Sequence, residues 1–397
     1  MPMNSIKNNI SLLVGLKNNL EYSKNFYYTT RALYPHIEIV FTSYNSTDGT
    51  HEWLNSLEDK NLVYYISAKD KTFSDTFNKC TQLATREYVV YAHNDIVLTP
   101  GFIENLEKHI AEQLIIYYTT IEPPIFSGDE RPGKIVKDFG ADVETLDKNG
   151  LYKFALEIQQ QNKDVLIPDA GTSFFLCANR QILLNIGGLD PLYNPMFCED
   201  DDLILRLRLS GLKTFTLLDA ICYHFVSKTS RFSEEYQNRT AQIEANSNKN
   251  FVRKWGFKNS SPIKKKYNIG LVVQNGNEDL LAKLEPWCSA IYIDADAANY
   301  VNEEQANTSI DLKTRIQPLN VSPNNDILIM VDGNDVNEKA LNKLQQINEV
   351  ITKKINSPAT FFEKLFKTDR FKFKFSIFTI WILKPVTHER QLINRMQ

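Results

Sequence analysis

Strand-like and helix-like segments alternate between Ile10 and about Val90, and this alternation limits the fold more than any other feature of the chain. Short polar turns separate the segments. Repeated strand–helix units with short connections favour a parallel sheet covered by helices. In such sheets ligands gather at the carboxyl ends of the strands. We therefore expect an α/β fold with its site at that edge. The four strand-like segments read ISLLVGL, IEIVFTSY, LVYYIS and EYVVYAH.

The regular alternation stops and later resumes, which predicts more than one domain. Residues 116–170 are punctuated by Pro and Gly and read as loops and short strands. A second strand–helix pattern covers residues 266–355 and is long enough for a small separate α/β domain, whose role the pattern leaves open. We expect domains at 1–260 and 266–355, followed by a separate segment at 356–397.

The C-terminal segment is basic, aromatic and apolar at the same time. From Lys353 to Gln397 the chain carries ten Lys or Arg residues against three Asp or Glu, and it contains the run FKFKFSIFTIWIL. One interpretation is a peripheral contact with a membrane. The other is a strand that completes a sheet, or an interface between copies of the chain. The sequence leaves both open.

Composition excludes several classes of protein. The formal net charge of -3 gives no global basic surface for nucleic acid. The five cysteines include no CxxC pair, which argues against a disulfide framework and a zinc knuckle and favours a cytosolic protein. No apolar run approaches the roughly 18 residues that span a bilayer, and the N-terminus lacks the pattern of a signal peptide. We expect a cytoplasmic protein, or one held peripherally at the inner face of the membrane.

Five motifs follow one another within residues 10–232: IEIVFTSYNSTDGT, EYVVYAHNDIVLTPGFIENL, GTSFFLCANRQILLNIGGLD, CEDDDLILRLRLSGLKT and YHFVSKTSRF. In this order they resemble the motifs of the family 2 glycosyltransferases with the GT-A fold. The resemblance leaves the 266–355 block and the tail unmatched. It implies a Rossmann-like mixed sheet flanked by helices and a hexosyltransferase-type enzyme that uses a nucleoside-diphosphate sugar.

The resemblance implies a metal site at the end of the fourth strand. Asp95 is the last residue of a degenerate DxD motif and would bind Mn²⁺ or Mg²⁺ together with His224, a donor set of oxygen and imidazole that suits these ions. The cation would neutralise the charge that develops on the diphosphate as it leaves. His93 and Asn94 would line the ribose and the sugar. Taken alone, His224 reads as a core or strand-end histidine, and only the family's spacing of the residues after it makes it a metal or diphosphate ligand.

The resemblance also implies a general base at the acidic run that begins with Glu199. Asp200 would take the proton of the acceptor hydroxyl, and Glu199 beside it would contact the acceptor or the donor sugar. The alternative is that these carboxylates only cap a helix and offset its dipole. Asp202 is expected to face solvent or a neighbouring turn.

Polar residues at the strand ends would hold the donor, although this part of the chain departs from the family pattern. The first strand keeps only the Asn of the usual motif. The second strand ends in Ser43-Tyr44-Asn45, where the family has an Asp that holds the base, so the nucleotide stays open. Lys228 and Arg231 would close over the diphosphate. The implied donor-binding residues are Leu16, Asn18, Ser43, Asn45, Lys71, Asn78, His93 and Asn94.

Our leading hypothesis is an inverting, metal-dependent glycosyltransferase whose acceptor is a hydroxyl of a glycan, a lipid-linked glycan or a protein. Two alternatives remain. A nucleotidyltransferase would need a Gly-rich basic loop after the first strand, and GLKNNLEYSK has little of that character. A catalytically silent binding or scaffolding module is suggested by the missing base-binding Asp and by His93 in place of the first acidic residue of the DxD motif.

Overall fold

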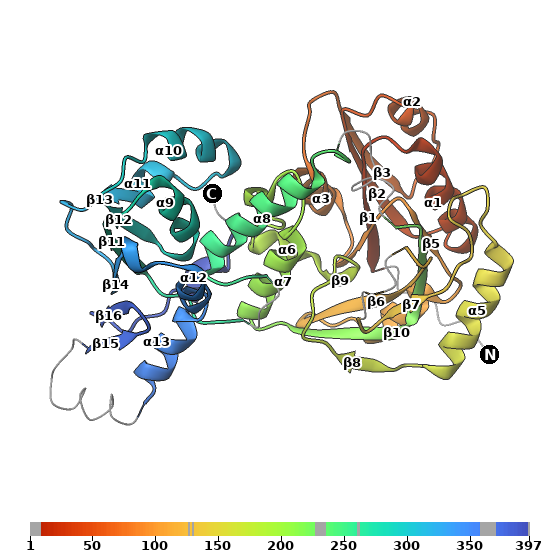
Figure 1. The fold of residues 1–397 in the computed structure, drawn as a ribbon. Coiled ribbons are helices and arrows are strands. Elements are labelled where there is room, and N and C mark those ends of the chain that lie inside the picture. The colour runs from red at the N-terminus through yellow and green to blue at the C-terminus, as the bar shows by residue number, and fades with distance from the viewer. Residues whose placement is uncertain are drawn as a thin grey trace. The chain divides into compact units, whose positions relative to one another are not determined.

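The computed structural model describes residues 9–125, 128, 131–226, 236–259, 263–357 and 371–395. By its internal contacts the chain divides into two compact units, one ending at Ala241 and the other beginning at Gln242. Figure 1 shows the elements of both. Among the described residues, no helix has the length and apolar character needed to cross a membrane.

The first half of the first unit alternates strands and helices, as the sequence predicts. Its elements are β1 (Ile10–Leu16), α1 (Leu20–Leu33), β2 (Glu38–Tyr44), α2 (Thr50–Asn55), β3 (Leu62–Ser67), α3 (Phe73–Leu83), β4 (Tyr88–Ala92), β5 (Ile96–Leu98) and α4 (Phe102–His109). The second half is less regular. It contains β6 (Leu114–Glu122), β7 (Lys134–Val136), α5 (Lys148–Gln161), β8 (Leu166–Pro168), β9 (Leu176–Asn179), α6 (Arg180–Asn185), the 3₁₀ turn η1 (Pro191–Tyr193), α7 (Glu199–Leu209) and β10 (Lys213–His224).

These strands form one mixed sheet in the order β3-β2-β1-β4-β9-β6-β10-β5, with β7 on β6 and β8 on β10. The first four strands are parallel, and β9 pairs antiparallel with both β4 and β6. The chain order reverses between β1 and β4, and such a reversal marks the usual ligand position in an open α/β sheet. The expected mixed sheet flanked by helices is confirmed.

Residues 116–170 are more ordered than their Pro and Gly content predicts. Most of β6 lies in this range and joins β9 to β10 near the middle of the sheet. The Thr pair in YYTTIE interrupts the apolar run, yet Thr suits a strand, and Thr119 and Thr120 are buried. The helix α5 was also missed, because its sequence is largely polar and only Leu151 and Ala155 are buried.

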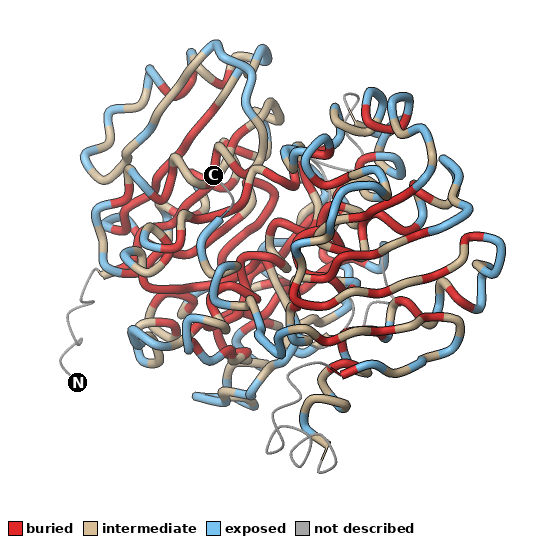
Figure 2. The backbone as a smooth tube through the Cα atoms, turned by 90° about the vertical axis from the view of Figure 1, so that its left-hand side faces the viewer, coloured by how far each residue is buried: buried red, intermediate tan, exposed pale blue. Residues whose placement is uncertain are grey.

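The core of the first unit follows its parallel strands. Val14, Val40 and Val90 on three adjacent strands are fully buried, as expected for strands covered by helices on both faces. Figure 2 shows the buried segments running along the strands and the exposed segments in the loops and outer helix faces. The packed sheet fixes the carboxyl ends of its strands, where the predicted site residues lie.

The second unit repeats the beginning of that topology on a smaller scale. Its sheet has the order β13-β12-β11-β14-β16-β15, and β11 to β14 are parallel. Its elements are most of α8 (Thr240–Trp255), then β11 (Ile269–Gln274), α9 (Glu278–Leu284), η2 (Glu285–Trp287), β12 (Ala290–Ile293), α10 (Ala298–Glu304), η3 (Gln305–Asn307), α11 (Leu312–Arg315), β13 (Ile316–Pro318), β14 (Ile327–Asp332), η4 (Gly333–Asp335), α12 (Glu338–Leu344), α13 (Ile347–Ile355), β15 (Phe371–Phe375), β16 (Phe378–Ile382) and η5 (Glu389–Leu392).

The basic aromatic run of the C-terminal segment completes this second sheet. β16 pairs antiparallel with β14 and with β15. Phe371 is buried, whereas Lys372 and Lys374 point to solvent, so the alternation of Phe and Lys is that of an outer strand. Of the two interpretations, the sheet-completing strand is the one that the structure shows, and membrane or oligomer contacts of this segment stay predictions. Residues 358–370 lie outside the described part of the chain.

Candidate functional site

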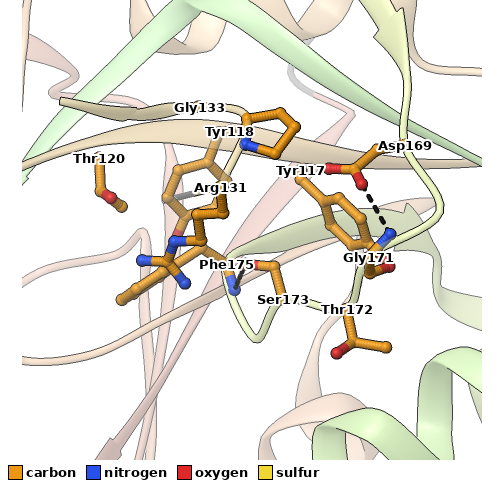
Figure 3. Close-up of a pocket in the computed structure, with 11 residues that line it drawn as sticks. Tyr117, Tyr118, Thr120, Arg131, Gly133, Asp169, Gly171, Thr172, Ser173 and Phe175 are labelled. Atoms are coloured by element: carbon orange, nitrogen blue, oxygen red, sulfur yellow. Dashed lines mark hydrogen bonds between the residues drawn. The ribbon is translucent and has the colours of Figure 1, made fainter. Parts of the chain in front are cut away.

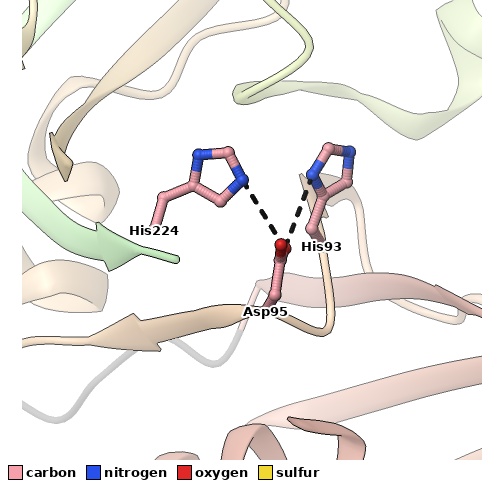
Figure 4. Close-up of side chains that lie close together, drawn as sticks. All are labelled: His93, Asp95 and His224. Atoms are coloured by element: carbon pink, nitrogen blue, oxygen red, sulfur yellow. Dashed lines mark ion pairs between the residues drawn. The ribbon is translucent and has the colours of Figure 1, made fainter. Parts of the chain in front are cut away.

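Two histidines and one carboxylate come together at the end of β4. His93 and Asp95 lie in the turn between β4 and β5, and His224 is the last residue of β10, paired with Ile96. Oδ1 of Asp95 is 3.8 Å from Nδ1 of His93 and 3.5 Å from Nε2 of His224. Figure 4 shows both imidazoles facing this carboxylate. One ligand atom from each residue lies within 4.8 Å of the others, so the three could hold a metal ion.

The surroundings of His93 keep its imidazole neutral. Its ring stacks on Phe174 at 4.6 Å between centroids, and Phe175 meets it edge-on at 5.1 Å. Desolvation by these neighbours lowers the pKa of His93 to about 4, although the charge of Asp95 acts in the opposite direction. A neutral imidazole has the lone pair that metal binding requires. His93 could therefore join Asp95 and His224 in holding a cation, and its predicted role at the sugar stays a prediction.

A buried glutamate that the sequence analysis missed lies behind His224. Oε1 of Glu122, the last residue of β6, is 3.3 Å from Nδ1 of His224. The same carboxylate accepts hydrogen bonds from Thr120 at 2.9 Å and Arg131 at 2.8 Å, and Nζ of Lys134 is 3.5 Å away. Burial acts to raise the pKa of Glu122, but the hydrogen bond and charge of His224, with Arg131 and Thr120, lower it to about 2.

Asp200 lies at the start of α7, where the backbone is strained. The two residues before the helix, Phe197 and Cys198, have φ of 75° and 66°, a conformation that costs non-glycine residues energy and gathers at functional sites. Burial, and then the charge of Asp201, raise the pKa of Asp200 to about 7, against the opposing charge of Arg131. Burial and Asp200 likewise raise the pKa of Glu199. A carboxylate with this pKa is suited to accept a proton near neutral pH.

The other two acidic residues of the run make structural contacts. Asp202 is fully buried, with Oδ2 2.6 Å from Nε of Arg206, and it accepts a hydrogen bond from Tyr193 in the neighbouring turn. The expectation that Asp202 faces solvent is therefore wrong, while the neighbouring turn is indeed one of its contacts. Asp201 accepts a hydrogen bond from Thr172.

Four of the predicted donor-binding residues lie together at the ends of β1 and β2. Leu16 pairs in register with Ser43. Asn18 joins the turn after β2, where its N–H donates to Ser46 and its Oδ1 accepts from the N–H of Thr47. Oγ of Ser43 is 2.8 Å from Oγ of Ser46 and 3.0 Å from Nε2 of His51. Asn45 follows directly and donates its N–H to Ser67.

Of the other four predicted donor-binding residues, His93 belongs to the cluster described above, and the remaining three have contacts of a different kind. Nδ2 and Oδ1 of Asn78 both bond to the backbone of Leu189, so this amide ties α3 to the Gly-Gly turn. Asn94 is buried and donates to Ser23 on α1. Lys71 is half exposed, with Nζ 3.8 Å from Asp75. The role of these three residues toward a donor stays a prediction. Lys228 and Arg231 lie outside the described residues.

A pocket opens beside the cluster. Arg131 and Phe175 link it to the histidines, since Arg131 bonds to Glu122 and the ring of Phe175 lies 4.8 Å from that of His224. Thr172 links it to the acidic run through Asp201. Figure 3 shows the aromatic rings, hydroxyls and guanidinium around the space. The pocket is lined by Tyr117, Tyr118, Thr120, Arg131, Pro132, Gly133, Asp169, Gly171, Thr172, Ser173 and Phe175.

A comparison with models of protein families gives a match over part of the chain. Residues 11–178 match the family described as glycosyl transferase family 2. A comparison with curated protein sequences gave no significant match. Among solved structures, the chain is similar to a mannosyltransferase from Pyrobaculum calidifontis in complex with GDP-Man and Mn²⁺, at 17% identity and a TM-score of 0.40, covering 59% of this chain and 61% of that one.

Two further structures show a similar degree of likeness. GalNAc-T7 with UDP, GalNAc and Mn²⁺ is 10% identical, with a TM-score of 0.41 over 54% of this chain and 43% of that one. S. aureus TarS 1-349 is 13% identical, with a TM-score of 0.39 over 62% of this chain and 72% of that one. The chain thus spans less than two thirds of the first two structures.

Proposed function

We propose, from the match of residues 11–178 to glycosyl transferase family 2, that the protein transfers a sugar from a nucleoside-diphosphate donor to an acceptor hydroxyl, with inversion at the anomeric carbon. The observation that carries the proposal is the convergence of His93, Asp95 and His224 at the carboxyl edge of the sheet. The carboxyl of Asp200 at the start of α7, whose pKa is raised to about 7, would be the general base of the reaction.

The donor would lie along the ends of β1 and β2. Leu16, Asn18, Ser43 and Asn45 line this edge, and the hydroxyls and ring nitrogen around Ser43 can bond the edge of a nucleotide base. These groups both donate and accept hydrogen bonds, so they do not select one base. The diphosphate would then reach the His–Asp cluster at the end of β4.

The residues of the cluster fit a divalent cation. One carboxylate and two imidazoles lie within 4.8 Å of one another, close enough to share a cation. A cation held there would neutralise the charge that develops on the diphosphate as the sugar leaves. Two imidazoles favour a borderline metal over Mg²⁺, which prefers oxygen ligands. We therefore propose Mn²⁺ as the working ion.

The acceptor would enter through the pocket next to Arg131 and Thr172. Asp200 takes the proton of the acceptor hydroxyl. The oxygen of that hydroxyl bonds to the anomeric carbon as the bond between the sugar and the diphosphate breaks. Glu199 lies beside Asp200 and contacts the acceptor or the donor sugar. Aromatic rings together with hydroxyls line this pocket, a composition that suits a saccharide. We propose a glycan, free or linked to lipid or protein, as the acceptor.

A screen over sugar nucleotides tests the proposal. The protein is incubated with UDP-, GDP-, CDP- and dTDP-sugars in the presence of Mn²⁺, and release of the nucleoside diphosphate is measured. We expect release from at least one donor, lost on chelation and in Asp95→Ala. A chain that binds one of the nucleotides but never releases diphosphate with any acceptor glycan would instead be a silent binding module.

A further inference from the structure

We propose that Glu122 is a positioning residue that holds the proton of His224 on Nδ1 and so turns the Nε2 lone pair toward Asp95 and His93. The expected effect of Glu122 on metal binding rests on the proposed function. The expected tautomer of His224 does not, because it can be measured on the metal-free chain.

The strand pairing brings the two residues together. β6 and β10 are parallel neighbours, and Ile121 is in register with Tyr223, so Glu122 and His224 follow side by side at the same edge. The two ring nitrogens of His224 then face two different carboxylates. Nδ1 is 3.3 Å from Glu122 and Nε2 is 3.5 Å from Asp95. An imidazole placed in this way has one nitrogen for a carboxylate behind it and the other for a cation in front.

Three further side chains hold Glu122 in place. Thr120 and Arg131 donate to Oε1, and Nζ of Lys134 lies 3.5 Å from Oε2. The Glu122 side chain is only 5% exposed, so its negative charge is poorly hydrated. The positive charges of Arg131 and Lys134 offset this loss of hydration. A carboxylate held by so many donors has no freedom to rotate. It can therefore fix the ring plane of His224 as well as its tautomer.

This arrangement predicts what the substitution Glu122→Gln does. Glutamine has nearly the same shape as glutamate but only one side-chain oxygen. Arg131 and Lys134 both donate to that oxygen, so the NH₂ group of the glutamine turns toward Nδ1 of His224. An NH₂ group donates, so the proton of His224 moves to Nε2, where it blocks the lone pair. Loss of such an orienting partner costs a metal site about 10- to 100-fold in affinity.

The matched control is Glu38→Gln. Glu38 is also a buried strand carboxylate of the first unit, bonded to Ser11 at 2.6 Å and to the N–H of Thr85 at 2.7 Å, with Arg86 3.9 Å away. It lies at the amino-terminal end of β2, away from the carboxyl edge of the sheet. Both variants lose a buried carboxylate, and both should lower the melting temperature. Only Glu122→Gln should affect His224 and the metal.

Two measurements on the full chain test the proposal. The first is the tautomer of His224 by ¹⁵N NMR of histidine-labelled, metal-free protein, with the resonance assigned through His224→Asn. The second is Mn²⁺ affinity by electron paramagnetic resonance, in the presence of UDP or GDP. We expect an Nδ1–H tautomer in the native chain, its loss in Glu122→Gln, and an Mn²⁺ Kd about 10- to 100-fold higher in that variant alone.

The outcomes separate the inference from the proposed function. An Nε2–H tautomer in the native chain, or an unchanged tautomer in Glu122→Gln, overturns the positioning role. So does an equal Mn²⁺ affinity of the native chain and Glu122→Gln. A native chain with the Nδ1–H tautomer that binds no Mn²⁺ with either nucleotide leaves the positioning role standing and contradicts the metal-dependent function.

Discussion

Asp202 and Arg206 form an ion pair in which neither side chain is exposed, with Oδ2 and Nε 2.6 Å apart. They are four residues apart on α7, so they lie on the same face of the helix. Arg206 also donates to the carbonyl groups of Ile186 and Gly188, which anchors the Gly-Gly turn. The acidic run at the start of α7 therefore contains residues of different kinds: Asp202 supports the fold through Arg206, while Asp200 is the residue that we propose as the base.

Asp202→Ala should destabilise the first unit by about 3–5 kcal/mol, because it leaves the Arg206 charge buried without its carboxylate. Asp279→Ala is the control, since Asp279 and Lys283 have the same spacing and a 2.7 Å contact but are largely exposed. That variant should cost less than about 0.5 kcal/mol. Denaturant unfolding measures both. Equal losses in the two variants would contradict the role of burial.

Asp200→Asn should lower sugar transfer by about 10²–10⁴-fold, the usual contribution of a general base. Asparagine has nearly the same shape and cannot take the proton of the acceptor hydroxyl. Nucleotide and Mn²⁺ binding should not change, because Asp200 lies outside the His–Asp cluster. Initial rates of transfer and calorimetric titration with the nucleoside diphosphate check the two parts. An active Asp200→Asn protein would rule out the base assignment.

The pH dependence of transfer should follow the carboxyl of Asp200. Burial and Asp201 raise its pKa to about 7, and only the ionised form can act as a base. Below that value kcat/KM should therefore fall about tenfold per pH unit, and above about pH 8 it should level off. The positive charge of Arg131 lowers this pKa, so Arg131→Gln should move the midpoint to higher pH. A midpoint below about pH 5 would contradict the assignment.

The parallel half of the first sheet was predictable because its strands alternate with helices every few residues and are apolar along their whole length. The segment that holds β6 was not. Its strand passes through two Thr residues and ends at a Glu before a Pro-Pro pair, which reads as a turn. Nothing local marks Glu122 as functional, because its contact with His224 depends on the pairing of β6 with β10.

Within the site, local spacing carried part of the information. The interval between Asp202 and Arg206 is that of a helical ion pair, so this contact was available from the sequence. The contact of Asn78 with Leu189 was not, because it joins α3 to a turn more than 100 residues later. Asp95 and His224 could be placed in one site only through the family resemblance, since no pattern in the chain relates the ends of β4 and β10.

His93→Asp should shift the metal preference of the enzyme from Mn²⁺ toward Mg²⁺. The native cluster offers two imidazoles and one carboxylate, and the variant offers one imidazole and two carboxylates, a set of harder ligands. Two carboxylates at the distance of His93 from Asp95, 3.8 Å, also repel each other when no cation is bound. The metal-free variant should therefore melt at a lower temperature and gain more stability than the native chain on adding Mn²⁺.

The ratio of transfer rates at saturating Mn²⁺ and saturating Mg²⁺ measures this shift. His36→Asp is the control, because His36 is exposed and lies before β2, outside the cluster. It makes the same chemical change without altering the ligands. We expect the Mn²⁺ to Mg²⁺ ratio to fall in His93→Asp and to stay constant in His36→Asp. If the ratio is the same in all three proteins, His93 does not contact the cation, and its role reverts to the sugar-lining one that the sequence first suggested.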